Sequence, residues 1–217
     1  MSTSDADVTD PNAKGADTTP PPLRRGPWTT LAVRPAYANP WIEVAEHDVL
    51  DPSGRPGLYG IVSPRHLAIG VLPIFADATT VLVGQYRYAL DEYSWEMPEG
   101  GGQKGVAPQE SAARELAEET GFEADGWAAL QRIHLSNSIS DEVAINFLAW
   151  DLRPVRGGPT PETTEADLVS ARVPFVSVLE RVLAGEITDS LTVSMVLLVE
   201  VLRGRGGLPA PVALALR

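Results

Sequence analysis

The chain has 217 residues, a formal net charge of -12 and no cysteine. The excess of acidic side chains argues against nonspecific binding to nucleic acid or to an anionic membrane surface. The lack of cysteine excludes disulfides and cysteine-ligated zinc, and it agrees with the reducing cytoplasm, where we expect the protein to act. The longest apolar run, residues 193–202, is too short to cross a bilayer.

The first part of the chain predicts a tail followed by a small sheet. Residues 1–25 are polar and nearly free of large apolar side chains. Because such a segment cannot bury enough surface to offset the entropy of ordering, we expect it to be disordered. Residues 26–65 are rich in strand-forming residues between turn signals, which favours an N-terminal β subdomain. Its expected antiparallel strands are Thr30–Arg34, Trp41–Val49 and Leu58–Val62.

The middle of the chain predicts further strands ahead of a glycine-rich segment. We expect His66–Phe75 and Thr80–Arg87 to pair with each other, with the turn between them at Asp77 and Ala78. A shorter strand, Ser94–Met97, then leads into the glycine cluster.

The C-terminal half of the chain combines strands and helices. The expected strands are Trp127–Leu135, Val143–Leu152 and Leu168–Val173. The expected helices are Phe175–Leu183 and Ser190–Arg203, the second with Asp189 as its N-cap. Runs of strands flanked by a few helices indicate the α+β class, with a mixed sheet packed between helices. We assign residues 66–205 to the main domain and residues 206–217 to a C-terminal tail.

Residues 96–122, EMPEGGGQKGVAPQESAARELAEETGF, join a glycine cluster to a helix that is expected over Pro108–Thr120. Glu115, Glu118 and Glu119 are related by i, i+3 and i+4, so their carboxylates share one helix face. Like charges repel at that spacing, and a bound cation would relieve the repulsion. Hard carboxylate oxygens suit Mg²⁺ or Mn²⁺, which we therefore expect as cofactor.

The same stretch resembles the Nudix box, whose pattern is G-x5-E-x7-R-E-U-x-E-E-x-G-U, with U a bulky aliphatic or similar residue. One specified position differs, because Val106 stands where the pattern has its first glutamate. The loss of that carboxylate predicts a looser loop or an altered number of metal ions. The matching residues are Gly100, Arg114, Glu115, Leu116, Glu118, Glu119, Gly121 and Phe122.

The resemblance implies the Nudix fold, an α/β/α sandwich, and a role for several residues. Glu115, Glu119 and Glu118 would ligate the metal. The backbone carbonyl of Glu99 would be a further ligand. Arg114 would hold the glutamates in place through charge-assisted hydrogen bonds.

The flanks of the box resemble the ADP-ribose pyrophosphatase branch of that family. A QxR strand, Gln85–Arg87, and an E-x-P-x-G entry, Glu96–Gly100, precede the box. The resemblance implies that Arg87 contacts the substrate diphosphate. It also implies that Glu142, in the polar loop after the box, is the general base or an additional metal ligand.

The aromatic residues near the N-terminal strands leave two interpretations open. Trp28, Trp41 or Tyr37 is the candidate to stack on the nucleotide base. For the two tryptophans, core packing or dimer contacts are the alternative. The resemblance also implies a homodimer in which the N-terminal strands are exchanged or packed across the interface.

The resemblance implies metal-dependent hydrolysis of a nucleoside diphosphate-linked small molecule. ADP-ribose or a related nucleotide sugar would yield a nucleoside monophosphate and a sugar phosphate. Two alternatives stay open. One is a diphosphatase that prefers GDP-mannose, and the other is a non-catalytic Nudix module that binds a nucleotide as a sensor, which the change at Val106 favours.

Overall fold

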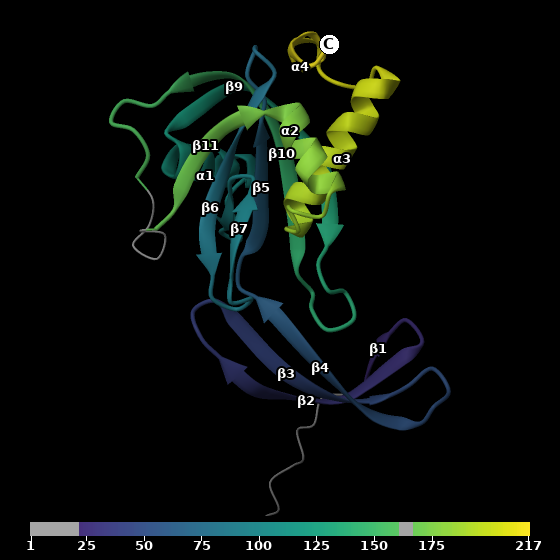
Figure 1. Cartoon of the computed structure of the whole chain (residues 1–217). Helices are drawn as coiled ribbons and strands as arrows, with labels where there is room; N and C mark the ends of the chain where they lie inside the picture. Colours follow the sequence, from purple (N-terminus) through teal and green to yellow (C-terminus); the bar gives the residue numbers. More distant parts are fainter. Residues whose placement is uncertain (1–21, 161–166) are drawn as a thin grey trace, which may run out of the picture.

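The structure, a computed structural model, describes residues 22–160 and 167–217 (Figure 1). Most of the expected disordered tail, residues 1–21, lies outside these ranges. The last part of that tail departs from the prediction, because Leu23–Arg25 form strand β1, which pairs with β2 (Trp28–Ala38). A neighbouring strand that offers unpaired backbone groups can order such a segment, and composition does not reveal this neighbour.

The predicted antiparallel N-terminal sheet is confirmed. It adds β3 (Ile42–Leu50) and β4 (Pro56–Pro64) to the first two strands, in the order β1-β2-β3-β4. Figure 1 shows this sheet set apart from the other strands, with the loop between β9 and β10 extending toward it. The edge strand β4 contacts that loop through the Val62 N–H, which donates to the Ile139 carbonyl at 2.8 Å.

Two further sheets form the centre of the main domain. One has the order β8-β5-β10-β9 and the other has the order β11-β6-β7. Strand β5 runs parallel to β10 and antiparallel to β8, so the sheet is mixed, as predicted. The strands are β5 (Leu67–Pro73), β6 (Thr79–Arg87), β7 (Glu92–Glu96), β8 (Glu99–Gly102), β9 (Phe122–His134), β10 (Val143–Pro154) and β11 (Val169–Pro174).

The predicted pairing of β5 with β6 is wrong. The turn between them does form, because the Phe75 N–H donates to the Thr79 carbonyl at 2.9 Å. However, β5 pairs with β8 and β10, whereas β6 pairs with β7 and β11. Both strands are buried along most of their length. A continuous apolar run of this kind predicts a buried strand but does not specify its partner.

Helix α1 (Pro108–Thr120) covers one face of the central strands (Figure 1). Its residues Ala112 and Leu116 are fully buried and pack in one cluster with Ile69 and Val71 of β5. Because the helix is anchored by these apolar contacts, its acidic residues keep a defined orientation relative to the strands.

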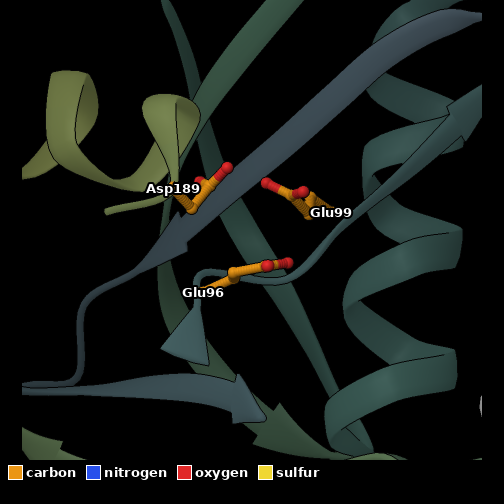
Figure 2. Close-up of side chains that lie close together, drawn as sticks. All are labelled: Glu96, Glu99 and Asp189. Atoms are coloured by element: carbon orange, nitrogen blue, oxygen red, sulfur yellow. The ribbon is translucent and has the colours of Figure 1, made fainter. Parts of the chain in front are cut away.

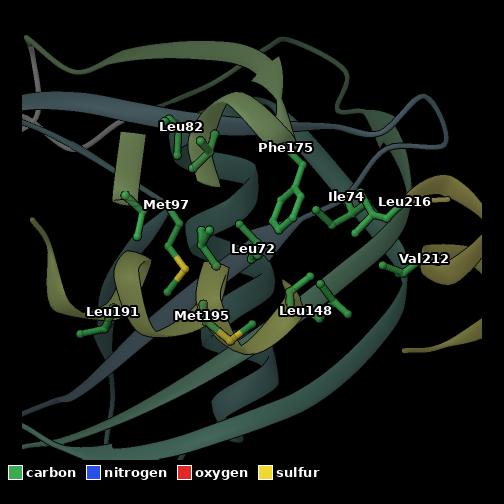
Figure 3. Close-up of a cluster of buried hydrophobic side chains, with 14 of the residues drawn as sticks. Leu72, Ile74, Leu82, Met97, Leu148, Phe175, Leu191, Met195, Val212 and Leu216 are labelled. Atoms are coloured by element: carbon green, nitrogen blue, oxygen red, sulfur yellow. The ribbon is translucent and has the colours of Figure 1, made fainter. Parts of the chain in front are cut away.

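Helices α2 (Phe175–Leu183) and α3 (Ser190–Arg205) pack against the opposite face, which completes the helix–sheet–helix layers that the sequence predicted. Strand β5 presents Leu72 to this side, since successive strand residues point to opposite faces. Figure 3 shows the resulting cluster, in which side chains from strands and helices meet. Its labelled members are Leu72, Ile74, Leu82, Met97, Leu148, Phe175, Leu191, Met195, Val212 and Leu216.

The C-terminal segment belongs to this core, which corrects the prediction of a tail over residues 206–217. It forms α4 (Ala210–Ala215), and Leu208, Val212 and Leu216 are at most 9% exposed. Val212 and Leu216 are four positions apart and share one face of the helix, and Leu208 packs into the same core from the bend before it. A helix this short contains too little apolar periodicity to be recognised in the sequence. Within the described ranges, the helices are all too short or too polar to span a bilayer.

Two predicted helix ends are confirmed. Gly121 ends α1 with a φ of 70°, in the left-handed region that favours glycine, and its N–H donates to the Ala117 carbonyl at 3.0 Å. At the start of α3, the Asp189 carboxylate accepts a hydrogen bond from the Thr192 N–H at 2.7 Å. The cap holds Asp189 in a defined position at the candidate site.

Candidate active site

A cleft of about 650 Å³ lies between the N-terminal sheet and the main domain. The N-terminal sheet contributes Trp41 and Val62 to its lining, and the main domain contributes Arg87, Glu99 and Glu142. The side formed by the N-terminal sheet is thus apolar, whereas the main-domain side carries charged groups beside apolar ones such as Leu67 and Ile69. This composition is typical of a site for a small molecule that has both polar and apolar parts.

The predicted helix-face carboxylates lie where α1 contacts β8. Glu115 and Glu119 are buried, with 5% and 1% exposure, whereas Glu118 is partly exposed. Arg114 donates to Glu118 Oε2 and to Glu115 Oε1, both at 2.5 Å, and to the Gly101 carbonyl at 3.0 Å. The arginine therefore ties two of the three carboxylates to strand β8.

A glycine at position 100 lets the helix carboxylates approach the strand. A Cβ atom on Gly100 would lie 2.3 Å from the carboxyl carbon of Glu115, so a side chain here would displace that carboxylate. One residue earlier, the Glu99 N–H donates to Glu119 Oε2 at 3.1 Å. The box helix therefore packs directly against the glycine cluster, and Glu115 and Glu119 lie against strand β8.

Arg87, predicted to contact the substrate diphosphate, reaches the cleft from the end of β6. Its Nε donates to Glu96 Oε1 at 2.9 Å, and its Nη2 donates to Glu99 Oε1 at 3.0 Å. The hydrogen bond with Glu96 raises the pKa of Arg87 above its ordinary value. The side chain remains 34% exposed, so the guanidinium is paired with carboxylates on one side and accessible on another.

Three carboxylates from separate parts of the chain converge (Figure 2), and two of them pair with Arg87. They belong to Glu96 at the end of β7, Glu99 at the start of β8 and Asp189 before α3, and we call them the acidic cluster. One oxygen of each lies within 4.8 Å of the others. Burial raises the pKa of Glu99 well above its ordinary value, and the charges of Asp189 and Glu96 act in the same direction. A cation in the cluster would offset this repulsion.

The sequence did not predict the acidic cluster as a group. It predicts Glu99 as a ligand through its carbonyl, Glu96 as part of the E-x-P-x-G entry and Asp189 as a helix cap. The three meet because the Met97 N–H donates to Thr192 Oγ1 at 2.8 Å, and this hydroxyl donates to Asp189 Oδ2 at 2.7 Å. Met97 and Thr192 are 95 positions apart, so no local spacing encodes the contact.

The donor atoms of the acidic cluster suit a divalent cation such as Mg²⁺ or Mn²⁺. Glu99 Oε2 is buried and has no hydrogen-bond partner among residues 22–160 and 167–217. A buried carboxylate oxygen left in this state is costly unless a cation compensates it. The grouped side chains offer carboxylate oxygens, which hard cations prefer. The residues present therefore fit the metal that the sequence predicts.

Comparison with known proteins identifies the family. The NUDIX domain model matches residues 64–187, and the model of the nucleoside diphosphate sugar hydrolase N-terminal domain matches residues 28–62. The chain belongs to the Nudix family. The resemblance inferred from the box and its flanks is thereby confirmed, and so is the prediction of a Nudix hydrolase.

Two curated Nudix relatives are named ADP-ribose pyrophosphatase. The relative from Mycobacterium tuberculosis is 33% identical over 145 residues, which cover 66% of this chain and 70% of the relative. The relative from Bacillus subtilis is 31% identical over 123 residues, which cover 57% of this chain and 66% of the relative. The matched region thus spans about two thirds of each relative.

A solved structure supports the predicted Nudix fold. The crystal structure of an ADP compounds hydrolase aligns with a TM-score of 0.73 at 23% identity and covers 83% of this chain and 97% of that chain. The likeness extends over both the N-terminal sheet and the main domain, since their combined length is needed for this coverage. The predicted α+β Nudix fold is therefore confirmed.

The loop between β9 and β10 also reaches the Nudix site. Glu142, its last residue, lines the cleft together with Arg87 and Glu99. Its N–H donates to Ser140 Oγ at 3.0 Å, and burial raises the pKa of its carboxyl above the ordinary value. The structure thus brings this predicted base to the cleft that β8 borders, and the box carboxylates pack against that strand.

The two tryptophans predicted as base stackers lie in different cavities of the Nudix structure. Trp41 is 65% exposed and lines the cleft, together with Arg87. Trp28 lines a second cavity of about 230 Å³ and packs edge-on against Tyr59. Trp41 is therefore the better placed of the two tryptophans to meet a ligand beside Arg87.

Val106, which replaces the first box glutamate, is 38% exposed in the turn before α1.

Proposed function

We propose that this Nudix protein hydrolyses the diphosphate bond of ADP-ribose or a related nucleotide sugar and releases a nucleoside monophosphate and a sugar phosphate. The observation that carries the proposal is the cleft in which Arg87, Glu99 and Glu142 lie with the exposed Trp41, together with the acidic cluster beside Arg87. The relatives named ADP-ribose pyrophosphatase support this substrate class. The cysteine-free chain suits the cytoplasm as its compartment.

A cation is needed before a diphosphate can bind beside the acidic cluster. The acidic cluster carries more negative charge than Arg87 offsets, and the substrate phosphates add to that charge. Mg²⁺ or Mn²⁺ would be held by the acidic cluster and by the box carboxylates Glu115, Glu119 and Glu118. When bound, a divalent cation neutralises phosphate oxygens and lowers the pKa of water.

The side chains of the protein would perform the other tasks of the reaction. Arg87, through the accessible part of its guanidinium, would donate hydrogen bonds to phosphate oxygens. Trp41 would stack on the base. Glu142 would take a proton from the attacking water. Arg114 would keep Glu115 against β8 while the substrate enters.

Turnover of a defined substrate panel tests the proposal. The full chain is incubated with Mg²⁺ or Mn²⁺ and with ADP-ribose, GDP-mannose or a dinucleotide, and the products are separated by ion exchange. We expect AMP and ribose phosphate from ADP-ribose, loss of turnover with EDTA and recovery when the metal is restored. Faster turnover of GDP-mannose would change the substrate within the same class.

The panel also distinguishes the hydrolase from a nucleotide sensor. Val106 in place of a box carboxylate is the observation that favours a sensor. Tight binding of a nucleotide by isothermal titration, without hydrolysis of any panel member, would support the sensor and contradict the proposed hydrolysis.

We further propose a homodimer in which the N-terminal sheets pack together. This sheet exposes several large apolar side chains, and their burial between two copies would remove apolar surface from water. They are Leu23, Leu31, Val33, Tyr37 and Leu58.

Sedimentation at micromolar concentration checks the dimer. We expect about twice the chain mass of 23.2 kDa for the wild type. Val33→Asp places a charge at one of these exposed apolar positions and should shift the protein to monomer. The matched control is Val169→Asp, which places the same charge at a similarly exposed position on β11 and should leave the dimer intact. A monomeric wild type would refute the proposed assembly.

A further inference from the structure

Residues 136–142, which we call the base loop because they end at Glu142, are bound to strand β4 of the same chain. The Val62 N–H donates to the Ile139 carbonyl at 2.8 Å, and the Asp141 N–H donates to the Val62 carbonyl at 3.3 Å. The contact has the form of a parallel β-bridge. The base loop therefore covers the edge of the N-terminal sheet at its last strand, β4.

Two side chains of β4 add hydrogen bonds to this contact. Tyr59 Oη donates to the Ser138 carbonyl at 2.5 Å. Ser63 Oγ donates to Asp141 Oδ2 at 2.9 Å. Because Tyr59 and Ser63 lie on the two sides of Val62 along the strand, their bonds hold the base loop on both sides of its backbone contact.

Close packing contributes less to the position of the base loop. The second cavity, of about 230 Å³, lies between loop residues 137–141 and the N-terminal sheet side chains Trp28, His47 and Ile61. Side chains across an open cavity do not make the close contacts that would hold the loop. Ile139, the large apolar residue of the loop, is 57% exposed. The hydrogen bonds to β4 therefore carry much of the positioning.

The base loop has its own internal structure, so it can shift as a unit. The N–H groups of Ile139 and Ser140 donate to the Ser136 carbonyl, each at 2.9 Å. Where the loop joins the two strands, the Leu135 N–H donates to the Glu142 carbonyl at 3.2 Å. A turn with this internal bonding keeps its shape, and its attachment to β4 decides how that shape is oriented toward the cleft.

We propose that Tyr59 and Ser63 are positioning residues, which hold the base loop so that the Glu142 carboxylate faces the cleft. The N-terminal sheet then supports the reaction within its own subunit, apart from any contact between subunits. The inference rests on the proposed hydrolase function. Because a misplacement of about 1 Å can cost about 10²-fold in rate, loss of the two bonds should slow the reaction without weakening substrate binding.

Removal of the two hydroxyl groups tests the inference. In Tyr59→Phe/Ser63→Ala, we expect kcat for ADP-ribose with Mg²⁺ to fall about tenfold, while KM stays within about twofold of the wild type. Amide hydrogen exchange should become faster in the base loop and stay unchanged in β10. Ser63→Thr keeps a hydroxyl donor, and in the Tyr59→Phe background it should recover part of the lost rate relative to the double variant.

The matched control is Tyr86→Phe/Ser53→Ala. It removes two hydroxyl groups that donate to aspartates away from the base loop, each at 2.6 Å. We expect wild-type kcat and wild-type exchange in the base loop. An equal loss of rate in the control would trace the effect to general destabilisation and overturn the inference.

Two results of the main experiment would also overturn it. One is an unchanged kcat in a double variant whose base loop exchanges faster. The other is unchanged exchange in the base loop. A wild type that hydrolyses no panel substrate would refute the proposed function instead, and the exchange measurement would then decide by itself whether Tyr59 and Ser63 hold the loop.

Discussion

Replacement of Glu142 by glutamine is expected to lower kcat for ADP-ribose by about 10²–10⁴-fold. Glutamine keeps the shape of the side chain but cannot accept a proton from water. KM should change little, because the carboxylate acts in the reaction and not in binding. The backbone bond from Glu142 to Ser140 Oγ does not involve the altered group, so the loop should keep its structure. Steady-state kinetics measure the effect, and a wild-type rate would exclude Glu142 as the base.

The pH dependence of kcat supplies an independent check of this role. Burial raises the pKa of Glu142 above its ordinary value. The ionised form that accepts a proton is therefore lost, as the pH falls, at a higher pH than for an exposed glutamate, whose pKa is about 4.3. In the wild type, we expect kcat to fall as the pH is lowered, with a midpoint above the ordinary glutamate pKa of about 4.3. The residual kcat of Glu142→Gln should show no such fall.

Replacement of Glu119 by glutamine is expected to lower turnover by about 10²-fold or more, because even supporting residues of metal sites typically contribute about 10–100-fold. Glu119 is 1% exposed and accepts the Glu99 N–H at 3.1 Å. The amide keeps the volume of the carboxylate and one acceptor oxygen, so the fold should be retained. Turnover and Mn²⁺ affinity, the latter by isothermal titration, are both expected to fall.

A residue on the same helix provides the control for this prediction. Glu110 lies exposed in the first turn of α1, away from the Glu119 contact with β8. Glu110→Gln removes the same charge and should leave turnover and Mn²⁺ affinity unchanged. Wild-type values for both quantities in Glu119→Gln would remove this residue from the metal site.

Helix limits were predictable because their signals lie within the helix itself. The predicted ranges Pro108–Thr120 and Phe175–Leu183 equal those of α1 and α2. In α1, the proline at the first position and the glycine just after the last turn are favoured there by their own backbone conformations, and α2 begins directly after Pro174. Such preferences act between residues a few positions apart and do not require knowledge of the fold.

Strand partners were less predictable, and β8 shows why. Its residues, Glu99–Gly102, include three glycines, a composition that disfavours a strand. It forms because β5 offers a free edge, to which residues 99–102 pair over residues 67–70. In the same way, β5 and β6 each pair with other strands and not with each other, although the turn between them matches the prediction.

The contacts of the candidate site also differ in whether the sequence could predict them. The contacts of Arg114 with Glu115 and Glu118 follow from neighbouring positions on one helix, and the box pattern predicted them. The acidic cluster depends on how α3 docks against the strand that ends at Glu96. The attachment of the base loop to β4 depends in turn on where the N-terminal sheet lies. These two features had no signal in the local sequence.

The amino-acid sequence alone was thus sufficient to predict the helix that carries the carboxylates, the hard cation that these carboxylates suit, and the family. The three-dimensional fold decided that Arg87, Glu142 and Trp41 share one cleft, and that Asp189 joins Glu96 and Glu99. The physical reason is the range of the interactions. Contacts between helix neighbours require little loop closure, whereas contacts between distant segments form only when burial of the whole core offsets the entropy of bringing them together.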